Sequence, residues 1–381
     1  MEAATINFAC RHYRGSRPCI FNKLDRSECP TCTHGSEFHD RVLFIKLDAI
    51  GDVLRSASML PAIMARHDAP YIAWMTRRES VDLVGMLDHV DEVIELSAAG
   101  LTRVITGGWD QVYSLSNDLP SASLATAVAG RRPVVGYCVH DGSLKPSNAA
   151  AVRWLEMAAF DRVKRANSLS YQRLMLDIVG ARGDITPPAL RVPEPVRAAA
   201  AARVDGLFGG RTRPRVAVNV GSGGRWPKKM LGAAQIHGYI AALLGRRDVD
   251  VMLVGGAAEA EKTAEVMALS AGEARVRAAL TPTSIPEFVA TLMTADALLC
   301  GDTLALHIAT AIGLPAVAVF GPTSLAEIFD FGGLISKIAT PLLDCLSCYG
   351  DCDKTANCMT LLDVDALIER TLAQLARGRV P

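Results

Sequence analysis

Two aspartates follow the first strongly apolar run of the chain. The run RVLFI, residues 41–45, has the composition of a buried strand, and KLDAIGDV follows it at residues 46–53. Asp48 and Asp52 therefore lie at the carboxyl end of a strand, where Gly51 allows the backbone to turn tightly into a helix. The positive end of the helix dipole favours a carboxylate in its charged form. A general base, which must be ionised, and a helix cap are both consistent with Asp52, and the same alternatives hold for Asp48.

A second group of polar residues begins where the apolar run ALLCG, residues 297–301, ends. Asp302 and Thr303 open a predicted helix, and His307 follows one turn later. The free backbone N–H groups at such a helix start suit an anion such as phosphate. An ordinary capped helix with a structural histidine would show the same pattern.

A glycine-rich loop leads from a third apolar run into a group of cations. Its sequence is NVGSGGRWPKKM, residues 219–230. Glycines let backbone N–H groups approach a phosphate, and lysine supplies a mobile positive charge. The chain has no P-loop pattern and no GxGxxG after its first strand, which argues against an ordinary P-loop kinase or NTPase and against a dehydrogenase.

Eight of the ten cysteines form two sets near the ends of the chain. The first set has the spacing C-x8-C-x9-C-x2-C and the second C-x2-C-x3-C-x5-C. Four thiolates can complete a tetrahedral zinc site, and small segments without a large core often depend on such a site. We expect a structural metal, zinc or iron, at each set or shared between them, with plain reduced cysteines as the alternative. The eight candidate ligands are Cys10, Cys19, Cys29, Cys32, Cys345, Cys348, Cys352 and Cys358.

The elements that must position these residues alternate between strands and helices, which predicts βα units and mostly parallel sheets. In the first half, predicted strands lie at 41–45, 71–75, 90–96, 109–116 and 132–139. In the second half they lie at 215–220, 248–256, 297–301 and 315–321. A last amphipathic helix has Asp363 as its expected cap and Gly378 as its end.

A stretch with four prolines, DITPPALRVPEPV at residues 184–196, has the composition of a linker. We therefore expect two α/β domains, at residues 41–190 and 197–381, with residues 1–40 as a small Cys-rich appendage. In such sheets a ligand binds at the carboxyl ends of the strands, so it should lie in a cleft between the domains.

Composition limits the classes of partner and the location. Lys plus Arg and Asp plus Glu each number 40, so no overall basic field favours nucleic acid. No apolar run approaches the roughly 20 residues that span a bilayer, and residues 1–19 lack the apolar core of a signal peptide. We expect a cytoplasmic protein with reduced thiols, for which peripheral contact with the inner face of the membrane stays open.

Two of these stretches together resemble glycosyltransferase family 9, the bacterial heptosyltransferases. RVLFIKLDAIGDVLRSASMLPAI resembles the opening strand, loop and helix of that family, and GDTLALHIATAIGLPAVAVFGPT resembles its nucleotide-binding segment. The resemblance implies a GT-B fold of two Rossmann-like, doubly wound domains facing a cleft. It places the acceptor mainly on the first domain and the nucleotide sugar on the second. It also implies an inverting transfer without a catalytic metal, usually from an ADP-activated heptose.

The resemblance also implies roles for single residues. Asp52 matches the aspartate proposed as general base. The family's Lys-x-Trp-Pro lysine has no direct counterpart, because Gly224 stands two residues before Trp226, so Lys228 is the first candidate for the diphosphate and Arg225 the second. Glu259 matches an acidic residue that binds ribose hydroxyls, with Glu261 as a rival and a solvated helix charge as the alternative for both. The remaining nucleotide-binding candidates are Ser222 in the loop, and Asp302, Thr303, Leu304 and His307, where Leu304 replaces a glycine of the family.

The expected function is an inverting transfer of a sugar, heptose by the resemblance, from an ADP donor to an acceptor hydroxyl. The lipopolysaccharide core, another glycan, a lipid-linked acceptor, a small molecule and a protein hydroxyl are all open as acceptors. One alternative is the same fold with a different nucleotide sugar. Another is a catalytically degenerate, metal-stabilised binding or scaffold protein, which Leu304 and the missing Lys-x-Trp-Pro motivate.

Overall fold

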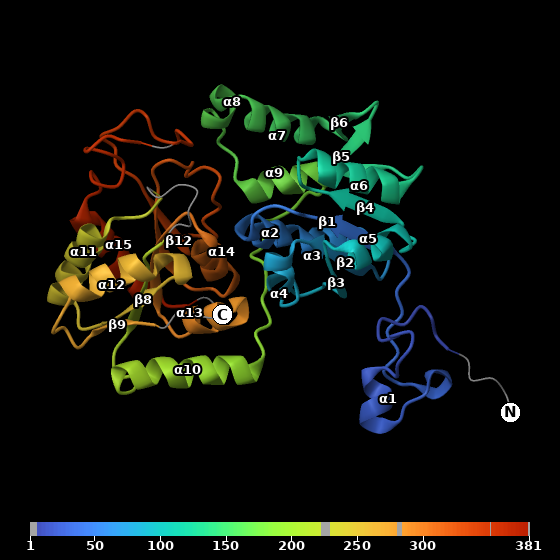
Figure 1. Cartoon of the computed structure of the whole chain (residues 1–381), viewed down its shortest axis with the longest axis horizontal. Coiled ribbons are helices and arrows are strands. Elements are labelled where there is room, and N and C mark those ends of the chain that lie inside the picture. Colours follow the sequence, from blue (N-terminus) through green and yellow to red (C-terminus); the bar gives the residue numbers. More distant parts are fainter. Residues whose placement is uncertain (1–5, 222–228, 280–283, 351, 380–381) are drawn as a thin grey trace.

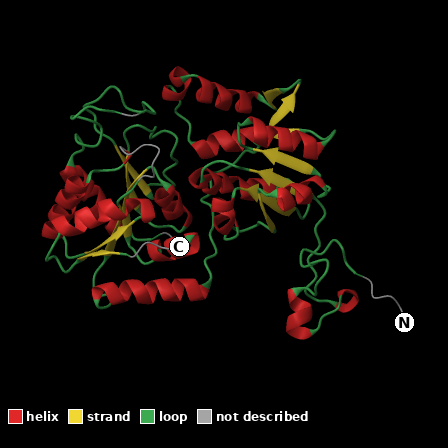
Figure 2. Ribbon diagram, viewed as in Figure 1, coloured by secondary structure: helices red, strands yellow, loops and turns green. Residues whose placement is uncertain are grey.

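Two six-stranded sheets form the centre of the computed structural model, and helices lie around each of them (Figures 1 and 2). The structure describes residues 6–221, 229–279, 284–350 and 352–379. None of the helices in these ranges has the length and hydropathy that crossing a bilayer requires.

The first sheet has the strand order β3-β2-β1-β4-β5-β6, and all neighbours are parallel except β5 and β6. Its strands are β1 (Arg41–Ile45), β2 (Tyr71–Thr76), β3 (Glu92–Glu95), β4 (Gln111–Ser114), β5 (Val134–His140) and β6 (Ser143–Pro146). The buried apolar runs that predicted these strands pack against helices on both sides, as a parallel sheet requires.

The second sheet has the order β12-β11-β10-β7-β8-β9 and is parallel throughout. Its strands are β7 (Arg215–Asn219), β8 (Asp250–Val254), β9 (Val276–Ala278), β10 (Ala297–Gly301), β11 (Ala316–Val319) and β12 (Ile335–Ile338). Counted from the first strand of each sheet, both orders are 3-2-1-4-5-6, the doubly wound order of Rossmann-like domains. The expectation of two mostly parallel α/β sheets is confirmed.

The helices of the first half are α1 (Ile20–Asp25), α2 (Ile50–Ser56), α3 (Leu60–Met64), α4 (Val81–Val84), α5 (Ala98–Ile105), α6 (Leu119–Ala129), α7 (Ala149–Ala159), α8 (Asp161–Arg165) and α9 (Tyr171–Ile178). Those of the second half are α10 (Glu194–Phe208), α11 (Ala233–Arg246), α12 (Ala260–Leu269), α13 (Ile285–Leu292), α14 (Leu304–Ala311) and α15 (Val364–Arg377). α15 begins and ends as predicted, with the Asp363 side chain accepting from two backbone N–H groups and Gly378 at its end.

Helix α10 begins inside the proline-rich stretch that the sequence predicts to be a linker. Pro195 stands in its first turn, where the missing N–H costs no helical hydrogen bond, and an alanine-rich segment continues it. The residues before α10 lie on the first domain, where Leu190 forms a bridge with Leu87.

In the N-terminal segment, residues 6–40, the part around α1 lies away from both sheets (Figure 1), whereas Phe38 at its end packs on Tyr71 of β2. Neither α1 nor the short 3-10 helix at Cys29–Thr31 has a buried residue. Arg11 joins the segment to the first domain, since its guanidinium pairs with Asp91 at 2.7 Å and donates to the Ala69 carbonyl at 2.9 Å.

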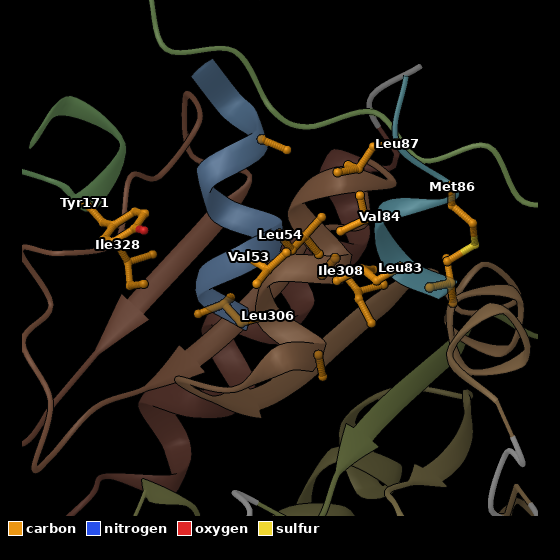
Figure 3. Close-up of a cluster of buried hydrophobic side chains, with 14 of the residues drawn as sticks. Val53, Leu54, Leu83, Val84, Met86, Leu87, Tyr171, Leu306, Ile308 and Ile328 are labelled. Atoms are coloured by element: carbon orange, nitrogen blue, oxygen red, sulfur yellow. The ribbon is translucent and has the colours of Figure 1, made fainter. Parts of the chain in front are cut away.

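A shared apolar core fixes the position of the two sheets relative to each other. α2 of the first domain packs against α14 of the second. Val53 and Leu54 on α2 lie beside Leu306 and Ile308 on α14 (Figure 3). All four side chains are fully buried, and burial of each contributes roughly 1.5–3 kcal/mol. The polar residues at the starts of these two helices are therefore brought together.

Candidate active site

A cavity of about 970 Å³ lies between the two domains. Residues that follow the carboxyl ends of β1, β8 and β10 line it, as expected for a ligand site in open parallel sheets. The sequence-predicted residues among its lining are Asp48, Asp52, Glu259, Asp302, Thr303, Leu304 and His307. Ser222, Arg225 and Lys228 lie outside the described residues.

Asp52 lies in the first turn of α2, where Arg55 holds its carboxylate. The helix has Ala49 as its N-cap, so Asp52 is not the cap residue. Its Oδ1 accepts from Arg55 Nε at 2.8 Å and lies 2.6 Å from Nη2. The Arg55 guanidinium stacks on the Tyr171 ring at 3.7 Å, which fixes it from the other side. The carboxylate is thus oriented, and a third of its side chain remains exposed to the cavity.

The charge state of Asp52 follows from opposing effects. Burial alone would raise its pKa, but the Arg55 guanidinium and the Lys46 ammonium outweigh burial, so the pKa is lowered from its ordinary value. At neutral pH the carboxylate is ionised and can accept a proton.

Asp48 has a different environment. Its Oδ2 pairs with Lys46 Nζ at 2.7 Å and accepts from Ser116 Oγ at 2.5 Å. Lys46 is 2% exposed and also donates to the Leu115 carbonyl. Buried lysines require such partners, so Asp48 serves the ion pair. Of the two aspartates, Asp52 has the geometry of a base.

His307 and Asp302 face Asp52 from the second domain. His307 packs so closely on Gly51 that a Cβ there would lie 2.9 Å from its Cδ2. Burial, and then the nearby Arg55, lower the pKa of His307 to about 4, so its imidazole is neutral at pH 7. Asp302 lies 3.9 Å from His307 Nε2 and 3.4 Å from Lys229 Nζ. Burial opposes its ionisation, but Lys229, His307 and Arg55 together outweigh burial and lower the pKa of Asp302.

The start of α14 forms the part of the cavity suited to an anion. Thr303 is its N-cap and makes no side-chain cap hydrogen bond to the helix; its Oγ1 instead accepts from Asn219 Nδ2 at 3.3 Å. Leu304, the first residue of the helix, lines the cavity where the family has glycine. The N-terminus of this eight-residue helix and the Lys229 ammonium together favour a phosphate group.

Glu259 lies at the other end of this wall, beside the glycines that follow β8. Its Oε2 accepts from the Gly256 N–H at 2.8 Å, and its side chain occupies the space that a Cβ at Gly221 would need. Glu261 is exposed on α12 and does not line the cavity. Glu259 therefore caps its own turn and also faces the ligand space.

Several residues that line the cavity could not be identified from sequence patterns. Lys229 is adjacent to the predicted Lys228, and Arg55 lies three residues after Asp52, which is a helical pairing distance. Arg78 and Glu79, which follow β2, also line the cavity. No sequence pattern indicates the further lining residues Trp154, Lys164, Glu327 and Tyr349.

The first cysteine set lies in the N-terminal segment 6–40 and the second follows β12 of the second domain, so the two sets are at opposite sides of the molecule (Figure 1). All the cysteines are free thiols, and a metal site shared between the sets would require a different arrangement. Burial raises the pKa of Cys358, and the nearby Cys348, Cys352 and Cys345 raise it further, so the C-terminal thiols are grouped. Among the described residues, no three or more His, Cys, Asp or Glu side chains are close enough to hold a metal ion.

Comparison with family models gives one match. Residues 100–354 match the model of glycosyltransferase family 9 (heptosyltransferase), which covers about two thirds of the chain. None of the proteins of curated function matches the chain.

Solved structures match over nearly the whole chain. The E. coli ADP-heptose lps heptosyltransferase II is 20% identical, with a TM-score of 0.65 over 88% of this chain and 99% of that one. A glycosyl transferase family 9 structure from Veillonella parvula DSM 2008 is 16% identical, with a TM-score of 0.71 over 89% and 98%. The E. coli heptosyltransferase WaaC with ADP is 16% identical, with a TM-score of 0.56 over 88% and 99%. At these identities the matches show the fold, and the expected GT-B architecture is confirmed.

Proposed function

This chain belongs to glycosyltransferase family 9, and from that premise we propose that it transfers heptose from ADP-heptose to a hydroxyl group of an acceptor. The observation that carries the proposal is an ionised, oriented carboxylate at Asp52 that faces an anion-binding helix start across one cavity.

In the proposed reaction Asp52 acts as the general base. It takes the proton of the acceptor hydroxyl while that oxygen attacks the anomeric carbon of the donor sugar. The bond from the anomeric carbon to the diphosphate breaks, and ADP leaves with the electron pair. Attack on the face opposite the leaving group inverts the configuration at that carbon.

The second domain would bind the leaving group. Lys229 and the start of α14 would stabilise the charge that develops on the diphosphate, a role that a metal ion has in other transferases. Asp302 positions the Lys229 ammonium, and neutral His307 fills the space against Gly51 without adding charge. Glu259 is the proposed ribose ligand. Closure of the two domains would exclude water and limit hydrolysis of the donor.

Titration of the purified protein with ADP, UDP and GDP tests the donor assignment. We expect ADP to bind most tightly, measured by calorimetry. Preference for UDP or GDP would keep the fold and the chemistry but change the donor. Absence of binding by all three would favour the degenerate scaffold protein.

We propose a structural role for the cysteine sets, separate from the transfer. The thiols of Cys345, Cys348 and Cys352 are close enough to Cys358 to raise its pKa, and these four would bind zinc or iron, with the N-terminal set as a second site. Such an ion would stabilise a segment with little core of its own. Metal analysis of protein purified without chelators should find one or two ions per chain. Removal of the metal by a chelator should lower the melting temperature. A metal-free protein that melts at the same temperature as the metal-loaded protein would contradict this role.

The acceptor remains the least defined partner. A glycan, the lipopolysaccharide core or another hydroxyl compound would satisfy the chemistry of Asp52. We propose a cytoplasmic enzyme, which for a lipid-linked acceptor would work at the inner face of the membrane.

A further inference from the structure

The cavity continues past the reaction centre into a region that the proposed roles leave unused. Its walls are α7 and α8 of the first domain and, from the second domain, the loop after β11 and the C-terminal cysteine segment. The lining residues there are Trp154, Met157, Lys164, Thr323, Glu327 and Tyr349.

Glu327 is a buried residue whose second carboxylate oxygen accepts no hydrogen bond from the residues that the structure describes. The residue is 9% exposed. Its Oε1 accepts from the Tyr349 hydroxyl at 2.5 Å, whereas no described residue donates a hydrogen bond to Oε2. Glu327 lines the cavity, so this oxygen is available to accept a hydrogen bond from a ligand bound there.

Tyr349 holds this carboxylate in a fixed orientation. The Ser324 N–H donates to the Tyr349 hydroxyl at 3.3 Å, so the hydroxyl hydrogen is directed to Glu327. The backbone N–H of Tyr349 donates to the Pro322 carbonyl at 2.8 Å. From the opposite domain, Lys164 Nζ lies 3.5 Å from the centre of the Tyr349 ring.

Two residues connect Glu327 with the reaction centre. The Tyr171 N–H donates to the Glu327 carbonyl at 2.9 Å, and Figure 3 shows Tyr171 beside Ile328, the next residue. The Tyr171 ring stacks on Arg55, which pairs with Asp52. Glu327 is therefore near the point where the sugar must lie during transfer.

Glu327 belongs to the same domain as the proposed diphosphate site at the start of α14. Glu327 and Thr323 lie on one loop, and the Thr323 side chain is close enough to Asp302, beside the start of α14, to help lower the pKa of that carboxylate. A sugar linked to a diphosphate bound there would extend along this loop.

We propose that Glu327 binds hydroxyl groups of the sugar that is transferred. The proposal rests on the proposed function. Sugar hydroxyls donate hydrogen bonds to Oε2, and the Trp154 ring, which packs edge-on to Tyr171 at 5.4 Å, offers an apolar surface to the sugar's C–H groups. Tyr349 acts as the positioning residue. A site built to accept a hydrogen bond from a hydroxyl discriminates against sugars that lack it.

Calorimetry with ADP and with ADP-heptose tests this subsite without an acceptor. The measured quantity is the ratio of the two affinities, because ADP alone does not reach Glu327. We expect Glu327→Gln to lower the affinity for ADP-heptose about tenfold relative to ADP, with ADP affinity unchanged. Tyr349→Phe should lower the same ratio by a smaller factor, and it leaves the carboxylate in place if Glu327→Gln folds poorly.

Glu156→Gln is the matched control, since this exposed glutamate on α7 lies outside the cavity. If Glu327→Gln and Tyr349→Phe show the same ratio of ADP-heptose affinity to ADP affinity as Glu156→Gln, the role of Glu327 is overturned, while the proposed function stands. Failure of the wild-type protein to bind either ligand would overturn the proposed function, and this inference with it.

Discussion

Replacing Asp52 by asparagine is expected to lower the turnover number of sugar transfer about 10²- to 10⁴-fold, the range typical of a lost general base. Asparagine keeps the shape of the side chain but cannot take the acceptor's proton. ADP affinity should stay within about twofold, because Asp52 lies on the domain opposite the nucleotide site. The measurement is ADP release from ADP-heptose with an acceptor that supports transfer by the wild-type enzyme.

The chain offers a matched control for this substitution. Glu194 on α10 also pairs with an arginine three residues later, Arg197, but the pair is exposed and outside the cavity. Glu194→Gln should leave transfer unchanged. If Asp52→Asn were as active as this control, the base would have to be another group.

The pH dependence gives the same assignment an independent test. Since the pKa of Asp52 is lowered, its proton-accepting form persists well below neutral pH, and kcat/KM should fall only as the pH drops through that lowered pKa. Arg55→Met removes the closest cation, so the pKa of Asp52 should rise and the acid limb should move to higher pH. If the acid limb stays at the same pH in Arg55→Met, the loss of kcat/KM at low pH is caused by the titration of a group other than Asp52.

The strands and the polar residues that follow them could be predicted from sequence for one physical reason. Parallel strands buried on both faces require continuous apolar runs, and polar residues can follow only at the carboxyl ends. Asp52, Asp302 and His307 therefore stood out, and the structure brings all three to one cavity.

The alternatives that the sequence left open could be decided only from the three-dimensional structure. The sequence could not decide which residue is the N-cap of α2, because the candidates lie within one helical turn. In the structure the N-cap is Ala49, and Asp52 lies in the first turn. The side chains that complete the cavity come from α7, α8 and two loops that have no periodic pattern. Glu327 and Tyr349 are 22 residues apart in sequence, and their contact follows only from the packing of those loops.

The sequence and the structure favour different lysines as the cation that neutralises the leaving diphosphate. The alignment of a glycine-rich loop cannot decide between adjacent lysines, and Lys228 is outside the described residues. Lys229 lines the cavity, with its ammonium 3.4 Å from Asp302 Oδ2. The carbonyl of Lys229 is packed so closely on Gly301 that a Cβ there would lie 2.0 Å from it, which places this residue firmly beside β10.

Lys229→Met is therefore expected to lower the turnover number about 10²- to 10³-fold, the effect of removing one donor to a developing negative charge. Methionine keeps the length and apolar stem of the side chain but loses the charge, and ADP affinity should fall as well, because ADP carries the same diphosphate. Lys145→Met, on the exposed strand β6, is the matched control. The decisive comparison is with Lys228→Met. A large loss in that variant, with Lys229→Met near the control, would return the role to Lys228 and leave Lys229 as the partner that keeps buried Asp302 ionised.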